Sequence, residues 1–351
     1  MNKVDEWFPS ISKQGGGKVG GHIKMAITFL MQKQYDKALN EVNAALELEP
    51  NNVIARILLG NIYYKQNKFE QAIDEAKASL KSGGRQIGAH MLLGRIYIDR
   101  LQYDEAEAEL QVALNLNPNQ KQENLIRLLL GRIYGRQKQH DKATEELQAV
   151  VKKNPQMKMA HLSLARLYML QKRHEDAVRE LRTILENNPN RKDIHRMLGA
   201  IYYDQKKFDK ATAEFKLFLD NQENSTRGLL SKRLSPQKGY VHYMLGCICM
   251  EQNNFDEAIK EFRLALQQNP RMAQPHQKIG NIFFKQGKVS NSIIEYKAAI
   301  TLRPRLAPAH LDLGHALVKA QKQDEAIEAY QKALKIDPEL KEAQKALDKL
   351  K

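Results

Sequence analysis

Cysteine is scarce in this sequence, which contains only Cys247 and Cys249 among 351 residues. Two thiols cannot build a disulfide framework or a four-thiolate zinc site. Long apolar runs are also absent, because no window approaches the roughly 18 residues of a membrane-spanning helix. Asp5 and Glu6 stand where a secretory signal would be cationic and then apolar. These absences predict a cytoplasmic protein, or a soluble fragment of a larger one.

Aromatic residues are few as well, at 7% of the chain, whereas charged residues make up 28% and leave a net charge of +15. A basic excess favours nucleic acid, anionic membranes or acidic proteins as partners. The excess is concentrated in residues 119–238, which carry 25 basic and 14 acidic residues and therefore contribute +11. Most of the basic excess thus lies in the middle third of the chain.

An internal period of 34 residues, with one step of 37 and one of 47, is the strongest signal in the sequence. A small residue recurs at this period: Gly60, Gly94, Gly131, Gly199, Gly246, Gly280 and Gly314, with Ala26 and Ala165. Counting each unit so that this residue is position 8, a bulky residue follows at position 11, a second small residue at position 20 and an aliphatic one at position 28. Each unit is therefore predicted to form two amphipathic helices. A proline closes most units and ends the second helix.

This pattern resembles the tetratricopeptide repeat family, whose 34-residue helix-turn-helix carries a small residue, an aromatic, an alanine and a closing proline at these positions. The resemblance covers residues 19–338 as nine tandem repeats, with Gly84 and Glu223 in place of two of the prolines. It implies an all-α, right-handed superhelical solenoid. Leu340, Ala343 and Leu347 predict a final amphipathic helix that caps the stack.

Breaks in the period suggest how the chain is organised. Residues 1–18 are glycine-rich and predict a flexible segment, in which Trp7 and Phe8 belong either to a disordered tail or to an aromatic anchor. Residues 19–223 hold repeats 1–6, residues 239–338 hold repeats 7–9, and residues 339–351 form the capping helix. The 37-residue step predicts a longer turn around residues 119–123. The 47-residue step predicts a basic loop insertion at residues 224–238.

No group of residues predicts catalysis. Histidine forms a column at position 4: His22, His90, His161, His195, His242, His276 and His310. Successive first helices lie about 10 Å apart, whereas zinc needs nitrogens about 2 Å away, so neighbours in the column cannot share a metal. We interpret the column as packing between adjacent hairpins. The glycines fall in the repeat columns and form no phosphate-binding loop. We therefore predict no enzyme activity, catalytic residue, metal site or cofactor.

The family resemblance implies that the first helices line a concave groove. Positions 2, 5, 6, 9, 12 and 13 should face it, and most of these residues are apolar. An exposed apolar strip of this length would imply an occupant, although burial of part of the strip in the core remains an alternative. The predicted contacts with a partner, apart from arginines, are Asn61, Tyr64, Leu92, Leu129, Met169, Tyr203, Tyr243, Met244 and Asn281.

Arginines add charge to this groove. Arg95, Arg132 and Arg166 occupy position 9 of three consecutive units, and Arg136 lies one helical turn after Arg132. They suit forked bonds to carboxylates or phosphates, unless acids on adjacent hairpins already satisfy them. The sequence predicts a non-enzymatic adaptor or scaffold that binds acidic, amphipathic peptide or helical segments of partner proteins. The alternatives are nucleic-acid binding by the basic middle third and self-assembly through residues 1–18.

Overall fold

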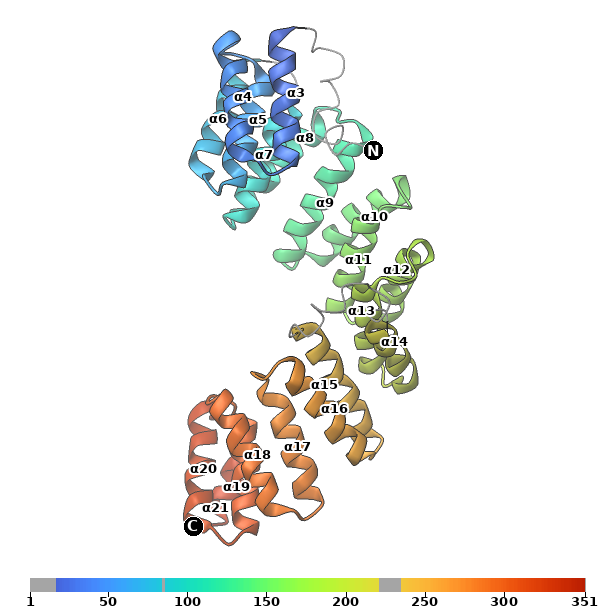
Figure 1. Cartoon of the computed structure of the whole chain (residues 1–351), viewed down its shortest axis with the longest axis vertical. Helices are drawn as coiled ribbons and strands as arrows, with labels where there is room; N and C mark the ends of the chain where they lie inside the picture. The colour runs from blue at the N-terminus through green and yellow to red at the C-terminus, as the bar shows by residue number, and fades with distance from the viewer. Residues whose placement is uncertain (1–16, 84–85, 221–234, 351) are drawn as a thin grey trace. The chain divides into compact units, whose positions relative to one another are not determined.

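The computed structural model describes residues 17–83, 86–220 and 235–350, in which nineteen helices and no strand occur (Figure 1). Eighteen of the helices pair into nine hairpins. The first helices are α3 (Lys18–Met31), α5 (Val53–Lys65), α7 (Ile87–Asp99), α9 (Gln120–Arg136), α11 (Lys158–Leu170), α13 (Lys192–Asp204), α15 (Pro236–Glu251), α17 (Ala273–Lys285) and α19 (Ala307–Lys319). The second helices are α4 (Tyr35–Leu48), α6 (Phe69–Lys81), α8 (Tyr103–Asn115), α10 (His140–Lys153), α12 (His174–Asn187), α14 (Phe208–Asp220), α16 (Phe255–Gln268), α18 (Val289–Leu302) and α20 (Gln323–Ile336). The predicted all-α solenoid of helical hairpins is confirmed.

The chain divides into two compact units, Met1–Ile184 and Leu185–Lys351. Within each unit a hairpin packs mainly on its neighbours in sequence, as repeat proteins do. At the end of the second unit, α21 (Lys341–Asp348) packs on α20 and buries Ala343 and Leu347. This is the predicted capping helix.

Every hairpin turns through one residue in the left-handed backbone region, at position 15. Only Gly287 (φ 75°) is glycine there, and the other eight have φ between 57° and 62°. The next backbone N–H donates to the carbonyl of position 11, as Gln139 does to Tyr134 at 2.8 Å. This six-residue closure satisfies a carbonyl at the end of the first helix. It explains why one short turn suffices in all nine hairpins.

The two small columns lie in the core, as predicted. All nine residues at position 20 are fully buried: Ala38, Ala72, Ala106, Ala143, Ala177, Ala211, Ala258, Ser292 and Ala326. Position 8 faces position 24 of the second helix, so a Cβ at Gly280 would lie 2.6 Å from the ring of Tyr296, and one at Gly94 would lie 2.7 Å from Leu110. The missing Cβ therefore sets how closely the helices of these hairpins approach.

Two predicted irregular segments are partly helical. The extra residues around 119–123 are not a longer turn, because Asn119 caps α9 through a capping box and the helix extends over 17 residues. Ser235 caps α15, whose first residue is Pro236, so the last three residues of the predicted loop at 224–238 are helical. Most of that loop lies outside the described residues. The N-terminal segment with Trp7 and Phe8 also lies outside them.

Candidate functional site

An exposed surface in the first unit combines apolar and basic side chains. The neighbouring helices α9 and α11 are in contact, and each presents positions 2, 6, 9, 12 and 13 on one helical face. On α11, Met159 is 62% exposed and Leu170 is 72% exposed, beside the exposed Arg166 and the half-buried Met169. We call the surface formed with α9 the α9–α11 surface, and it consists of Leu125, Leu129, Arg132, Arg136, Met159, Arg166, Met169 and Leu170.

The contribution of α9 is more strongly basic. Leu125 and Leu129 are half-buried at its start, whereas Arg132 and Arg136 are exposed one and two turns further on. Arg136 and Arg166 form no ion pair with any residue that the structure describes. The α9–α11 surface therefore offers two unpaired guanidinium groups next to exposed hydrophobic side chains.

Four side chains, Tyr64, Arg95, Asp99 and Arg132, contact one another across the neighbouring helices α5, α7 and α9. The Tyr64 hydroxyl donates to Asp99 Oδ2 at 2.5 Å, and the Arg95 guanidinium lies over the Tyr64 ring, 4.7 Å from its centre. Arg132 Nη2 approaches Asp99 Oδ1 at 3.7 Å. These contacts join three successive first helices, so their inner faces are contiguous. The alternative that adjacent hairpins supply acids to the arginines thus holds for Arg132.

Burial shifts the pKa values of two side chains in this cluster. Burial lowers the pKa of the Arg95 guanidinium, an effect that the neighbouring Tyr64 partly offsets. Burial also raises the pKa of Tyr64, and the hydrogen bond to Asp99 raises it further. Arg95 and Tyr64 are therefore half-buried parts of an existing contact, less accessible to a partner than Arg136 or Arg166.

Three residues predicted to line the groove are instead buried. Leu92 is 1% exposed and Met244 is 8% exposed, and both pack in the core. Asn61 is 6% exposed, and its side-chain amide donates to the carbonyl of Ile57 at 2.8 Å. Their assignment as partner contacts is corrected, because neighbouring helices cover them.

Apart from the buried Met244, the predicted residues of the second unit are aromatic or amide side chains. Tyr203 packs on Phe208 with ring centres 6.0 Å apart, and Tyr243 packs on Phe262 at 5.8 Å. Burial raises the pKa of Tyr203 to about 12. Both tyrosines are half-buried, as is Asn281. No arginine occupies position 9 of the hairpins in this unit, and the basic residues at its inner positions include Arg196 at position 5 and Lys278 at position 6.

Asn281 belongs to a small polar group around Asp312. With its amide nitrogen turned toward them, Asn281 donates to Tyr296 Oη at 2.8 Å and to Asp312 Oδ2 at 3.2 Å. Gln277 Nε2 also donates to Asp312 Oδ2, at 2.7 Å. The amides therefore satisfy a partly buried carboxylate, and this part of the inner face is occupied by its own hydrogen bonds.

Six of the seven histidines in the column contact a glutamate of their own hairpin, and the predicted contact with the adjacent hairpin is seen for His161, His195 and His310, which lie against the carbonyl of the proline that closes the preceding unit. His161 Nδ1 lies 2.6 Å from Glu180 Oε2, and five other histidines make the same contact to a glutamate 19 residues later. Sequence reasoning missed these glutamates, although their recurrence at position 23 is visible in the sequence. It also missed Asp99, for which no comparable periodic signal exists.

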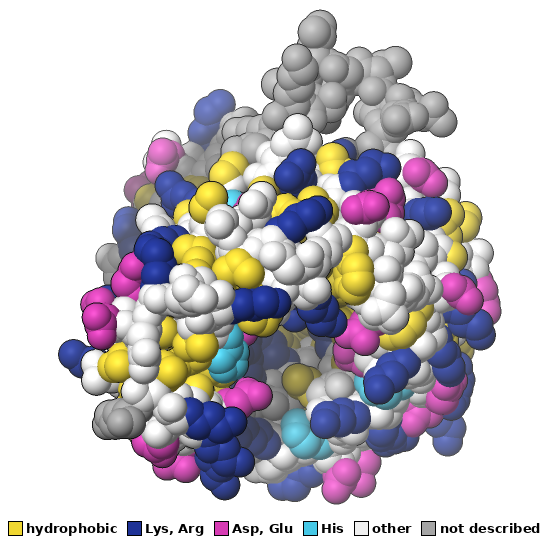
Figure 2. All heavy atoms as spheres, turned by 90° about the horizontal axis from the view of Figure 1, so that it is seen from below, with side chains coloured by type: hydrophobic (Ala, Val, Ile, Leu, Met, Phe, Trp, Pro, Cys, Tyr) yellow, Lys and Arg dark blue, Asp and Glu magenta, His cyan; other side chains and the backbone are white. Residues whose placement is uncertain are grey.

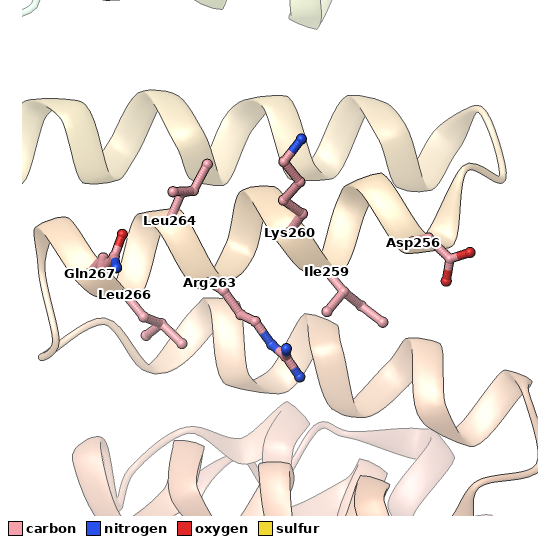
Figure 3. Close-up of a pocket in the computed structure, with 7 residues that line it drawn as sticks. All are labelled: Asp256, Ile259, Lys260, Arg263, Leu264, Leu266 and Gln267. Carbon is pink, nitrogen blue, oxygen red and sulfur yellow. The ribbon is translucent and has the colours of Figure 1, made fainter.

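Other surfaces are less suited to binding a partner than the α9–α11 surface. A depression of about 600 Å³ lies over α16, but its seven lining residues come from one helix and diverge: Lys260 and Leu264 point to one side and Arg263 to the other (Figure 3). In the view of Figure 2, basic and acidic side chains are interspersed and hydrophobic ones form small patches.

No helix in the described part of the chain is long and apolar enough to cross a membrane. Across residues 17–83, 86–220 and 235–350, no cluster of three His, Cys, Asp or Glu side chains could hold a metal.

Comparison with protein families identifies the repeat in several parts of the chain. Models described as tetratricopeptide repeat match residues 136–201, 239–272 and 307–340, and one described as TPR repeat matches residues 280–321. A model of anaphase-promoting complex, cyclosome, subunit 3 matches residues 31–113. No curated protein matches the chain.

Solved structures share the fold. A tetratricopeptide repeat protein from Parabacteroides merdae is similar with a TM-score of 0.57 and 18% identity, over 76% of this chain and 99% of that one. PilF from Pseudomonas aeruginosa has a TM-score of 0.52 and 16% identity, over 66% of this chain and 100% of PilF. The type IV pilus biogenesis factor PilW has a TM-score of 0.52 and 18% identity, over 64% of this chain and 98% of PilW. At these identities the likeness concerns the fold alone.

Proposed function

Because the chain belongs to the tetratricopeptide repeat family, whose members typically act as non-enzymatic scaffolds for protein–protein interaction, we propose that the α9–α11 surface binds an acidic, amphipathic segment of a partner protein. The observation that supports this most is the exposure of Met159 and Leu170 on the helical face of α11 that carries Arg166, with Arg136 exposed on the neighbouring α9. Exposed large apolar residues next to arginine are typical of recognition surfaces.

The chemistry of the surface defines the segment that fits it. Arg136 and Arg166 can each form two parallel hydrogen bonds with a carboxylate, while Met159, Met169 and Leu170 can cover apolar side chains of flexible shape. A helix with acidic and apolar residues at spacings of three or four presents both kinds of group on one face. We therefore expect ligands in which Asp or Glu alternates with Leu, Met or Phe at this spacing.

Peptide display on the immobilised protein provides the test. We expect selection to enrich acidic, amphipathic peptides, whose affinity is then measured by fluorescence anisotropy. Because a hydrogen bond to a charged group contributes about 1.5–3 kcal/mol, the Arg132→Glu/Arg136→Glu/Arg166→Glu variant should lose about 100-fold or more in affinity. Unchanged affinity in this variant would overturn the proposal.

A matched control separates local contacts from net charge. Arg263, Arg271 and Arg305 are exposed residues of the second unit, and their replacement by glutamate changes the net charge by the same amount. We expect this control to bind the selected peptides like the parent. A second variant, Met159→Ser with Leu170→Ser, should weaken binding without lowering helicity, because both side chains are exposed in the free protein.

The two alternative functions give different results. Nucleic-acid binding by residues 119–238 predicts that partners captured from a lysate disappear after nuclease treatment and that binding falls steeply with salt. Self-assembly through residues 1–18 predicts a change in oligomeric state when these residues are deleted. Protein ligands that resist nuclease and depend on the three arginines favour the α9–α11 surface.

A further inference from the structure

Eight of the nine hairpins join their helices by a contact between a histidine or arginine at position 4 and a glutamate at position 23. In six of them a histidine Nδ1 lies 2.6–2.7 Å from a glutamate Oε2: His22–Glu41, His90–Glu109, His161–Glu180, His195–Glu214, His242–Glu261 and His276–Glu295. In two hairpins arginine replaces histidine, with Arg56 3.0 Å from Glu75 and Arg127 2.7 Å from Glu146. Position 4 is therefore a place where this fold sets a histidine or arginine against a carboxylate.

The ninth hairpin has the histidine but not the carboxylate. Position 23 is Ala329, and His310 at position 4 is only 6% exposed. His310 Nε2 lies 2.9 Å from the carbonyl oxygen of Pro304. His161 and His195 make the same contact to a proline carbonyl, at 2.8 and 2.7 Å, but each also has its glutamate at Nδ1. His310 Nδ1 has no hydrogen-bond partner within the described part of the chain.

A cavity of about 380 Å³ opens at this position in the second unit. Its lining residues come from α18, α19 and α20, whose ribbons lie side by side in Figure 1. Buried His310 and Ala329 line it together with the apolar side chains of Ile300, Leu313 and Leu317. Although the His310 side chain is only 6% exposed, its Nδ1 is not among the fully buried polar atoms without a partner, so this atom can be reached from the cavity. The cavity has room for the carboxylate that the other hairpins supply.

The charged residues at the mouth of the cavity satisfy one another. Lys332 Nζ lies 2.6 Å from Glu328, and Lys297 Nζ lies 3.8 Å from Glu325. The side chains of both pairs are between 45% and 64% exposed. Neither glutamate forms a hydrogen bond with His310 among the described contacts. The rim is therefore close to neutral, and the interior offers one buried imidazole between apolar walls.

We propose that the cavity at His310 is a binding site for a carboxylate supplied from outside the chain, which takes the place of the glutamate that Ala329 replaces. The group that fits is a carboxylate on a short aliphatic stem, because a glutamate at position 329 would add only a methylene and a carboxylate beyond the Ala329 Cβ. A free organic acid and the side chain of a partner's acidic residue carry this same chemistry. The site lies in the second unit and is independent of the α9–α11 surface.

Binding must be linked to a proton. A carbonyl oxygen only accepts hydrogen bonds, so His310 Nε2 carries a hydrogen and donates it to Pro304, and the neutral ring leaves Nδ1 without one. A carboxylate can bond to Nδ1 only when one further proton is taken up from solution by the ring. Binding therefore takes up one proton, so the affinity should fall as the pH rises.

Acetate is the probe, and the readout is the ring nitrogen resonances of His310 in the full chain, assigned by their loss in a His310→Gln variant. We expect acetate to shift the Nδ1 resonance saturably near pH 6, at constant ionic strength with chloride as the balancing anion. Ala329→Glu supplies the carboxylate internally and should abolish the response. Ala329→Leu fills the cavity without a charge and should abolish it too.

A second arm distinguishes the sources of the carboxylate. N-acetyl-glutamate amide carries the same group on a peptide backbone, so a saturable response to it assigns the site to acidic side chains of a partner. A response to acetate alone assigns the site to free organic acids. The proposal is overturned if neither ligand shifts His310 saturably, or if either filled variant responds like the parent. The peptide affinity of the α9–α11 surface should be unchanged in both filled variants, so the two proposals fail separately.

Discussion

Burial determines how individual side chains at the inner positions behave. Asp312, at position 6 of the last hairpin, shows this for a charged group. Its carboxylate accepts a hydrogen bond from Gln277, yet burial raises its pKa above the ordinary value of 3.8, and the attraction of His315 and Lys278 offsets this only in part. The charge of Asp312 therefore lowers the stability of the folded chain at neutral pH, as expected for a partly desolvated carboxylate.

Replacement of Asp312 by asparagine should raise the thermal midpoint near pH 7. Because the folded chain holds the Asp312 proton more tightly than the unfolded chain, the cost of this group is absent below the unfolded pKa of about 3.8. It grows as the pH rises through the higher folded value. The difference in Tm between Asp312→Asn and the parent should therefore be positive near pH 7 and shrink toward zero near pH 3, as followed by circular dichroism.

An exposed aspartate gives the control for this measurement. Asp74 lies exposed in the middle of α6, and Asp74→Asn should change the Tm little across the same pH range. A loss of stability in Asp312→Asn at neutral pH would mean that the carboxylate's hydrogen bonds outweigh its desolvation.

Among the structural elements, the hairpin is the unit whose packing the sequence sets most directly. In the second unit an aromatic ring at position 24 always faces glycine at position 8: Phe215 with Gly199, Phe262 with Gly246, Tyr296 with Gly280 and Tyr330 with Gly314. In the first unit the corresponding pairs have smaller aliphatic residues, and alanine at position 8 occurs only there, as Ala26 and Ala165. Aromatic rings at position 24 thus occur only opposite glycine, whereas leucine occurs opposite both glycine and alanine.

Gly280→Ala should destabilise the protein by about 1–3 kcal/mol, because the added Cβ would lie 2.6 Å from the Tyr296 ring. Adding Tyr296→Leu should recover part of this loss, since it recreates the alanine and leucine of Ala165 and Leu181. Urea denaturation of the two single variants and the double variant measures the coupling. Additive effects would contradict direct contact between these positions.

For the molecule as a whole, each stack needs its last apolar face covered. Hairpins in a solenoid contact only their neighbours, so a terminal hairpin exposes one side of its core unless another element packs there. In the second unit α21 provides this cover, and Leu347 is only 4% exposed within the cluster that holds Tyr330 and Ala333. The covering helix α21 is short, with only eight residues.

Leu347→Ala should lower the stability of the last hairpin by about 2 kcal/mol or more, the cost of a large-to-small change in a core. Hydrogen exchange is the measurement, because local opening of α19 and α20 is visible there without global unfolding. Lys345→Ala, an exposed change on the same helix, is the control and should leave exchange unchanged. Equal exchange in both variants would show that α21 does not stabilise the stack.

The recurring local features of this protein follow from the sequence by itself. Apolar and small residues at fixed spacings specify amphipathic helices, and their recurrence at 34 residues specifies hairpins that must stack to bury both faces. The position 20 column is fully buried in all nine hairpins, and the family and the all-α fold could both be predicted from these spacings. The signals are local, because each depends on one helix and the partner within its own hairpin.

Only the tertiary structure decided which inner positions a partner can reach. Leu92 and Leu170 both carry the periodic signal of an inner face, yet one is 1% exposed and the other 72%. Periodicity shows which way a side chain points on its own helix, whereas exposure depends on how the next helix covers it. The alanine opposite His310 can be read in the sequence as Ala329, whereas the cavity beside it is a property of the packed helices. The sequence thus determined the repeated helical hairpins of this protein, and contacts between helices determined which of their surfaces are exposed.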